Sequence, residues 1–592
     1  MTTRNPIQIV EIDVPYCALT YGTAPCTAAL GTTGDAKCFN TFRTCQDTAN
    51  YDPSDTLTLR FARPQNGIPI GENIYPVLTD DVSGRSTKIN VGSPDDRTGP
   101  LGQREVITVN LRDFKNNDTY VDKYALERRD GTAQNSGVGY NPEDRGQFFQ
   151  RLLARWPYWI GAALRVKDGY VGDSLASMDT RHYVITKWSG PNASGGVQIE
   201  AKDVLDLADN KKAKCPKPTA GKLADDIGSA YTGTVDLTPS GIGSEYASAG
   251  RIAISSEVLS FTRSGDTLTI IGRGLDGTTA SDHSEGDTAQ QCYRVTDADP
   301  ADVLADILEN YAGISASFLP TTDWQDETGR WLAALRLTRT IVKPEGVLDL
   351  IGEICQLGLF LWWDRVDQEV KLRANRPLDY NETPQSIDDD ADIIEQTISM
   401  QELNDKRLTD VIFYHGQLDP TETREGNYRQ AFVATDTDAK SDNEYGQDRI
   451  IQIFSPWLGR SGDGSVASAV STRLLYRYRD TPRRLKFKVD IRKKDTIRVA
   501  DPITVNSRLL VDETGAETPG QFQVMSSTET DSGNRIELEV ETYQFTGRFG
   551  FITENGRSDY GSSTAAEIER GTYILGTGAT TFADGTGPYV IF

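Results

Sequence analysis

The sequence is organised around residues 17–45, CALTYGTAPCTAALGTTGDAKCFNTFRTC, which hold four of the chain's seven cysteines with the spacing C-x8-C-x11-C-x6-C. The residues between these cysteines are mostly turn formers, and they show no apolar period long enough for a helix. A loop of this composition cannot bury a core of its own. We therefore expect covalent or coordinate bonds to hold it together.

Three chemistries could hold such a loop, and the spacing alone leaves all three open, together with a fourth option in which the cysteines are buried small hydrophobes. Two disulfides suit an oxidising compartment, but no apolar leader follows Met1, so we expect folding in a reducing cytoplasm. Zinc accepts four thiolates, although structural zinc sites usually contain paired C-x2-4-C knuckles, which are absent here. A cubane iron-sulfur cluster also takes thiolate ligands and does not require short knuckles.

The other three cysteines have no ligand-spaced partner nearby. We expect Cys355 on the apolar face of a helix, Cys292 in a strand-like run and Cys215 in a loop.

The cysteine segment also resembles a known family. Its residues are similar to the cysteine-bearing part of tail hub proteins (baseplate hub or tail-tip proteins) of long-tailed phages and gene transfer agents. Related hub and tail-tip proteins carry a [4Fe-4S] cluster. The resemblance implies that this cluster is bound by Cys17, Cys26, Cys38 and Cys45, with zinc as the runner-up. The stretches that carry it are Tyr16–Gly22, Pro25–Cys26, Lys37–Thr41 and Thr44–Gln46.

Length and composition set broad limits. The 592 residues exceed what one core organises and predict roughly four domains. The 53 Gly and 26 Pro, with few long apolar periods, favour a β-rich chain with many turns. The formal net charge of −24 argues against a tight nucleic-acid partner, which needs clustered Lys and Arg. The chain contains no run of eighteen apolar residues, so no transmembrane helix is predicted.

The first large domain, residues 51–215, reads as a small barrel. Alternating strands are expected at 56–61, 106–111, 163–166 and 197–201, with one helix from Pro142 to Trp156. Three aspartates, Asp113, Asp118 and Asp122, invite comparison with a glycosidase acid pair. Pairing with arginines such as Arg104 and Arg128 is the favoured interpretation. The segments that also resemble the first hub domain are Leu101–Arg104, Asp113–Phe114, Asp118, Asp122–Tyr124 and Arg128.

An inserted β-rich lobe is predicted at 216–295, with strands at 251–254, 257–261 and 267–271. His283 lies in the most catalytic-looking patch of this lobe, Ser281–Asp287. Without a nucleophile elbow, a catalytic triad has weak support. We expect an exposed turn histidine.

The middle of the chain is predicted to be α/β. Helices begin after Asp299-Pro300 and near Pro344, and a hairpin spans 359–373. The adjacent Trp362 and Trp363 should point to opposite faces, so either a neighbour or the chain's own core covers them. A cluster of basic residues could dock an acidic partner subunit. Its members are Arg473, Arg477, Arg479, Arg483, Arg484, Lys486 and Lys488.

The predicted architecture is therefore mainly β with an α/β middle: small antiparallel barrels and mixed α/β domains, in the ring-forming arrangement that the hub resemblance implies. The expected divisions are 1–50 (cysteine-rich segment), 51–215 (first barrel), 216–295 (lobe), 296–380 and 381–490 (α/β), 491–550 (closing barrel) and 551–592 (Gly-rich tail).

The favoured function is that of a structural virion protein, made in the host cytoplasm and located at the tail tip of a siphophage-like particle. The hub resemblance implies a homotrimer that joins the tail tube and distal tail protein to the central fibre and other tail-tip proteins. It also implies contact with the tape measure protein and a lining role in genome ejection. We expect no enzyme activity, because no catalytic constellation is recognisable. A tail-associated cell-wall hydrolase is the alternative, and an electron-transfer protein is a third class.

Overall fold

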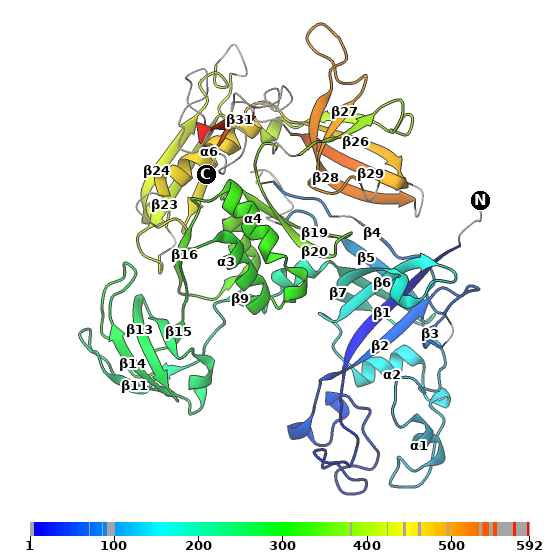
Figure 1. Ribbon diagram of the computed structural model, residues 1–592. Helices are drawn as coiled ribbons and strands as arrows, with labels where there is room; N and C mark the ends of the chain where they lie inside the picture. The colour runs from blue at the N-terminus through cyan, green and yellow to red at the C-terminus, as the bar shows by residue number, and fades with distance from the viewer. Residues whose placement is uncertain are drawn as a thin grey trace. The chain divides into compact units, whose positions relative to one another are not determined.

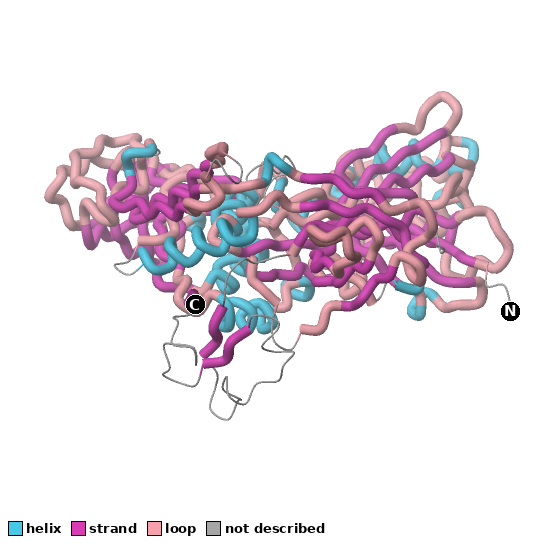
Figure 2. The backbone as a smooth tube through the Cα atoms, turned by 90° about the horizontal axis from the view of Figure 1, so that it is seen from above, coloured by secondary structure: helices cyan, strands magenta, loops and turns pink. Residues whose placement is uncertain are grey.

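The computed structural model describes residues 5–69, 71–85, 87–91, 101–378, 382–422, 424–441, 446–459, 463–493, 496–531, 535–543, 549–552, 572–575 and 589–590. Strands outnumber helices in it and form several separate sheets (Figure 2). The chain divides into two compact units, 1–85 with 104–206 and 86–103 with 207–592. The predicted fold class, mainly β and multidomain, is confirmed.

The first unit contains an eight-stranded, nearly closed barrel in the order β3-β2-β1-β6-β7-β8-β5-β4 (Figure 1). Residues 77–79 join its two sides. The Leu78 N–H donates to Ala62 O of β2, and the Thr79 N–H donates to Asn110 O of β5, each at 2.9 Å. The strands are β1 (Pro6–Tyr16), β2 (Asp55–Ala62), β3 (Ile74–Tyr75), β4 (Ser83–Arg85), β5 (Val106–Arg112), β6 (Ala163–Tyr170), β7 (Asp179–Ser189) and β8 (Gly196–Lys202).

The barrel core follows the predicted alternation. In β5, every second residue from Ile107 to Leu111 is buried. Helix α2 (Phe148–Arg155) adds Phe148, Phe149 and Leu152 to the same core. The single helix expected from Pro142 is divided, because Gly146 has a left-handed φ of 68° between a 3-10 turn (Pro142–Asp144) and α2. A short helix, α1 (Ala125–Asp130), lies between β5 and α2 in sequence.

Two long strands of the barrel, β1 and β7, were not among the predicted ones. In β1, Glu11 is buried and pairs with Arg60 at 2.8 Å and with Arg165 at 2.9 Å, each on a neighbouring strand. A buried carboxylate interrupts the apolar alternation on which strand prediction depends. Its partners lie 49 and 154 residues away, so only the fold brings them together.

The lobe at 216–295 is a six-stranded antiparallel barrel in the order β10-β11-β14-β13-β12-β15 (Figure 1). Lys222 bridges Thr288, and the Leu223 N–H donates to Asp287 O at 2.9 Å, so the first strand meets the segment before the last. All three predicted strands are present. The strands are β10 (Lys222–Leu223), β11 (Thr234–Thr238), β12 (Ala249–Ile254), β13 (Glu257–Ser264), β14 (Thr267–Gly272) and β15 (Ala289–Gln291).

The first part of the α/β middle, residues 296–378, contains the two predicted helices and one more, α4 (Thr321–Trp331). Only Trp324, Thr328 and Trp331 of α4 are buried, which is too weak an apolar stripe to predict a helix. The other elements are α3 (Pro300–Asp306) with a π-turn (Ile307–Tyr311), α5 (Val347–Cys355), the pairs β9 (Lys214–Cys215) with β18 (Glu345–Gly346) and β16 (Tyr293–Ala298) with β17 (Leu337–Ile341), and the hairpin β19 (Leu359–Asp364) with β20 (Glu369–Ala374).

The chain itself covers both tryptophans of β19. Trp362 is 6% exposed and packs in one apolar cluster with Ile89 and Phe360. Trp363 is 2% exposed, and its ring centre lies 5.4 Å from that of Phe318. No partner subunit is needed to explain this pair.

Helix α6 (Asp463–Tyr478) packs on a three-stranded sheet in the order β24-β23-β25. The predicted basic cluster on α6 and the following strand is not one exposed surface, because Arg473 and Arg477 are buried; docking of an acidic partner there stays a prediction. Arg473 is buried and donates to Trp331 O at 2.7 Å. Arg484 and Lys486 of β26 (Arg483–Asp490) pair with glutamates of the adjacent strand β29 (Arg535–Thr542) at 2.8 and 2.7 Å. The sheet strands are β23 (Asp410–Gln417), β24 (Tyr428–Thr435) and β25 (Ile450–Ser455).

A second six-stranded barrel follows, in the order β21-β27-β28-β29-β26-β22. Ile393 bridges Val489, so the segment after β21 returns to β26 on the other side of the sheet. The barrel takes strands from both 381–490 and 491–550, because strand pairing joins segments far apart in sequence. Its strands are β21 (Gln385–Asp388), β22 (Ser399–Glu402), β26 (Arg483–Asp490), β27 (Pro502–Asn506), β28 (Gly520–Asp531) and β29 (Arg535–Thr542).

Most of the predicted tail, 551–592, lies outside the described residues. Three short strands are described near the C-terminus, β30 (Phe549–Ile552), β31 (Thr572–Leu575) and β32 (Tyr589–Val590). Within the described parts of the chain, no helix combines the length and the apolar character needed to cross a bilayer.

Candidate metal centre

Residues 17–54 connect β1 to β2 as one long loop. Two short 3-10 turns, Phe42–Thr44 and Thr48–Asn50, are its helical elements, as expected from a turn-rich composition. Backbone bonds fix the start of the loop: the Cys17 N–H donates to Asn40 O at 2.8 Å, and the Ala18 N–H donates to Asp52 O at 3.0 Å. The loop is therefore folded back on itself next to the end of β1.

The four cysteines of this loop line one pocket. Cys17 is buried, and Cys26, Cys38 and Cys45 are partly buried. All seven cysteines of the chain are free, so none of the four forms a disulfide in this structure. The pocket has roughly 300 Å³ of space between its atoms, part of it open to solvent. Its other lining residues are Leu19, Tyr21, Asn40, Thr41, Asp47, Asn50 and Tyr51.

Two of the sulfurs accept backbone hydrogen bonds from the residue two positions later. The Asp47 N–H donates to Cys45 Sγ at 3.4 Å, and the Asn40 N–H donates to Cys38 Sγ. Asn40 holds a left-handed φ of 54°, which turns the chain directly after Cys38. Such N–H donors stabilise the thiolate over the thiol.

Other effects oppose ionisation of these thiols. Burial raises the pKa of Cys38, and the neighbouring Cys45, Cys26 and Cys17 raise it further. Burial also raises the pKa of Cys45, with Cys17, Cys26 and Asp47 adding to the effect. Four thiolates around one pocket are therefore unfavourable unless positive charge is placed between them. A metal centre supplies such charge and deprotonates its thiol ligands.

Which metal centre would fit depends on how far apart the ligand side chains lie. In the described parts of the chain, no set of three or more His, Cys, Asp or Glu side chains is placed to hold a metal ion as the side chains stand. One zinc ion, with zinc-sulfur bonds of about 2.3 Å, would need sulfurs about 3.8 Å apart. Asn40 Oδ1, a buried acceptor of a pocket-lining residue, has no hydrogen-bond partner. An all-thiolate donor set is one that an iron-sulfur cluster takes, and zinc accepts the same set.

The carboxylates considered for acid-base chemistry have structural partners. Asp122 pairs with Arg128 at 2.5 Å, and both side chains are buried. Asp118 pairs with Arg151 at 2.6 Å and Arg155 at 2.5 Å. Asp113 Oδ1 accepts the N–H of Phe149 in the first turn of α2 at 2.8 Å. Arg104 pairs with Asp206, not with the three aspartates. These contacts agree with the structural interpretation of the three aspartates.

The prediction of an exposed His283 is wrong. Its side chain is 1% exposed, and Nε2 lies 2.9 Å from Glu257 Oε2. The same carboxylate accepts bonds from Arg273 at 2.7 and 2.8 Å and from the N–H groups of Gly274 and Ser281, each at 2.9 Å. A histidine in a Gly-rich turn looks exposed in sequence, but here it joins a buried cluster around Glu257.

The remaining cysteines are each buried. Burial raises the pKa of Cys292 and of Cys355 to about 12. Cys215, predicted in a loop, lies in the two-residue strand β9, and burial raises its pKa as well. Burial of this kind makes thiols inert, so these three are not candidate ligands.

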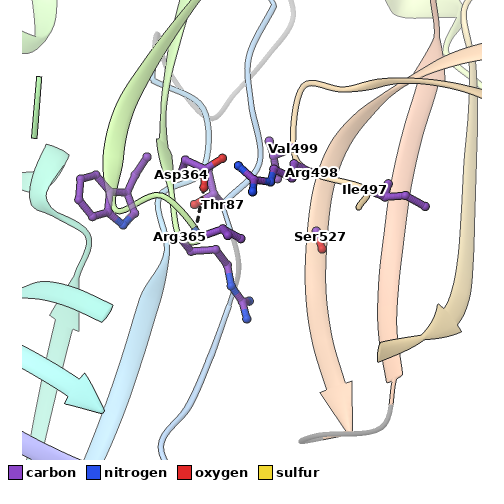
Figure 3. Close-up of a pocket in the computed structure, with 9 residues that line it drawn as sticks. Thr87, Asp364, Arg365, Ile497, Arg498, Val499 and Ser527 are labelled. Carbon is purple, nitrogen blue, oxygen red and sulfur yellow. Dashed lines mark hydrogen bonds between the residues drawn. The ribbon is translucent and has the colours of Figure 1, made fainter. Parts of the chain in front are cut away.

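A second pocket lies in the second unit (Figure 3). It has roughly 390 Å³ of space between its atoms, part of it open to solvent. Arg498, one of its lining residues, pairs with Asp367 at 2.8 Å. The pocket contains no set of residues arranged for catalysis or metal binding. It is lined by Thr87, Trp363, Asp364, Arg365, Val366, Ile497, Arg498, Val499 and Ser527.

Comparison with known proteins gives structural likenesses alone. No protein-family model and no curated protein sequence matches the chain. A 43 kDa tail protein of prophage MuSo2 from Shewanella oneidensis is 10% identical, with 78% of this chain and 95% of that chain covered and a TM-score of 0.32. A tail protein from Neisseria meningitidis MC58 is 11% identical, with 78% and 97% covered and a TM-score of 0.33.

A chain of a native gene transfer agent virion is 9% identical, with 49% of this chain and 80% of that chain covered and a TM-score of 0.15. These neighbours are tail and virion proteins. At such identities and TM-scores, the likenesses carry no argument about what this chain does.

Proposed function

We propose that this chain is a structural subunit of a phage-type tail, located at the hub of its distal end. The proposal is carried by the position of Cys17, Cys26, Cys38 and Cys45 around one pocket, because these residues belong to the segment that resembles tail hub proteins. The solved neighbours come from the same class of particle, but their likeness is too weak to support the proposal.

Within this proposal, the four thiolates hold a [4Fe-4S] cluster. The all-sulfur donor set and the N–H donors to Cys38 and Cys45 support this assignment. When bound, the cluster would supply the coordinate bonds and positive charge that the loop lacks, so metal binding would stabilise the folded loop. Zinc, which also accepts four thiolates, is the alternative occupant.

We further propose that three copies assemble into a ring. Each chain has a barrel in the first unit and a second barrel between Gln385 and Thr542, so three copies would present six barrels. That number would suit a sixfold tail tube docking on a threefold hub. The lobe between β10 and β15 is a third barrel and stands outside this count. The proposed neighbours are the distal tail protein, the central fibre or tail-tip proteins and the tape measure protein, around the channel through which the genome leaves.

Metal analysis of anaerobically purified protein tests the cofactor. We expect about four iron and four acid-labile sulfide per chain. Cys38→Ser should lose them, whereas Cys292→Ala, which changes a buried cysteine outside the loop, should retain them. A colourless protein with one zinc per chain would replace the cluster by zinc. A protein without bound metal would refute both.

Particle imaging tests the location and the assembly. Antibody labels against the chain should appear at the distal end of the tail, and labels along the tube would contradict a hub. Mass photometry of the released ring should give three times the chain mass of 65.1 kDa. A single copy per tail would refute the trimer.

A further inference from the structure

Arg128 of α1 is a buried cation that reaches into the cysteine loop. Its side chain is 1% exposed, and Nε pairs with Asp122 at 2.5 Å. Nη2 donates to Cys38 O at 2.8 Å, and Nη1 donates to Lys37 O at 3.1 Å. One guanidinium therefore binds the carbonyl groups on both sides of the Lys37-Cys38 junction, where a ligand cysteine sits.

The next residue, Phe39, is held by the same guanidinium. The guanidinium carbon of Arg128 lies 3.7 Å from the centre of the Phe39 ring, and that of Arg155 lies 4.1 Å from it. Arg155 is fixed in turn by Asp118 at 2.5 Å. Both cations belong to the barrel side of the site, and the aromatic ring between Cys38 and Asn40 packs against them.

Asn40 links the backbone next to Cys38 to Cys17 through hydrogen bonds. Its side chain is buried, and Nδ2 donates to Cys17 O at 3.2 Å and to Leu19 O at 3.1 Å. The Cys17 N–H donates back to Asn40 O at 2.8 Å. A continuous chain of contacts thus runs from Arg128 through Cys38 and Asn40 to Cys17.

We propose that Arg128 is a positioning residue of the four-cysteine site, which holds Cys38 and, through Asn40, Cys17 in place before any metal binds. This inference rests on the proposed metal centre, because it explains how a loop poor in apolar residues is ready to bind one. A guanidinium is needed because its planar fork binds two carbonyls and a carboxylate while stacking on a ring. A lysine ammonium is a compact charge without that geometry.

Arg128→Lys and Arg273→Lys form a matched pair for the test. Arg273 also pairs with a buried carboxylate, that of Glu257, at 2.7 Å and donates to the carbonyls of Gly228 and Ser281, but its hydrogen bonds reach no residue of 17–45. The metal-free full chain of each variant is treated with iodoacetamide, and the alkylation rates of Cys17 and Cys38 are followed by mass spectrometry. We expect both rates to rise in Arg128→Lys and to stay at the wild-type value in Arg273→Lys.

Retention of iron gives a second readout. Disrupting residues that orient ligands typically costs 10- to 100-fold in metal affinity, and we expect a loss of roughly that size in Arg128→Lys alone. Equal alkylation rates in the two variants would overturn the positioning role. If wild-type protein binds no metal, the proposed centre fails, while the alkylation rates still decide whether Arg128 orders the loop.

Asn40→Gly keeps the test decisive if Arg128→Lys does not fold. Glycine accepts the left-handed φ of this position but removes the side-chain bonds to Cys17 O and Leu19 O. Alkylation of Cys17 should then accelerate more than that of Cys38, which keeps its bond from Arg128. Equal acceleration of the two thiols, or none, would refute the proposed path from Cys38 to Cys17.

Discussion

Glu257→Gln should open the 216–295 lobe in a pH-dependent manner. Burial alone would raise the pKa of Glu257, but bonds from Arg273, from the N–H groups of Ser281 and Gly274, and from His283 outweigh burial and lower the pKa to about 2. Relative to an ordinary value of 4.5, this shift stabilises the folded lobe by about 3 kcal/mol at pH 7.

The sign of the pH dependence follows from the lowered pKa. The stabilisation is fully present above pH 4.5 and is lost as the pH falls toward 2, because the folded carboxylate then takes up its proton. Roughly 1 kcal/mol of it should remain at pH 3. Glutamine keeps the side-chain shape but has no charge, so it should forfeit this contribution and leave Arg273 without its buried counter-charge.

Hydrogen exchange measured on peptides of β12, β13 and β14 is the suitable assay, because a multidomain chain does not unfold in one step. Local opening should be faster in Glu257→Gln by on the order of 100-fold at pH 7 and by about tenfold at pH 3. Glu285→Gln, at an exposed position of the same lobe, should change neither value. A ratio between Glu257→Gln and wild type that is the same at both pH values would refute the reasoning.

Three further predictions concern other parts of the chain. Gly277→Ala should destabilise the second unit in thermal unfolding, because Gly277 has a φ of 94° and an added Cβ would lie 1.9 Å from Leu418 O; an unchanged midpoint would contradict this close approach. Phe148→Ala should cost about 3–5 kcal/mol in the first barrel, measured by urea unfolding or local exchange, since Phe148 is fully buried; a cost below about 1 kcal/mol would show that the core refills the space. Iron retention should fall as the pH is lowered, because the raised pKa of Cys38 and of Cys45 favours thiols over thiolate ligands; retention independent of pH between 5 and 8 would exclude these thiols as ligands.

Local patterns predicted much of the secondary structure. Alternation found β2, β5, β6 and β8 of the first barrel, and the Asp299-Pro300 start found α3. These signals are local, because side-chain period and capping act over a few residues. Prediction missed other elements, among them β1, which buries the charged Glu11, and α4, which buries only three residues.

The burial of individual side chains and the partners that they bind were harder to predict from the sequence. His283, Arg473 of α6 and Arg484 of β26 look exposed in sequence. In the fold they bind Glu257, the carbonyl of Trp331 and a glutamate of β29, respectively. The sequence predicts that Arg128 pairs with an aspartate. It gives no indication that Arg128 also binds Cys38 O, 90 residues away. Ion pairs between strands depend on register, which is set only when the sheets form.

The sequence by itself determined that residues 17–45 form a turn-rich loop with four cysteines and that the chain is mainly β, because turn chemistry and side-chain alternation are properties of neighbouring residues. Only the tertiary structure decided that the four cysteines line one pocket and that β21, β22 and β26 to β29 close into one barrel. Those arrangements depend on contacts between residues far apart in the chain. Barrel packing, strand register and the buried Arg128 together set their geometry.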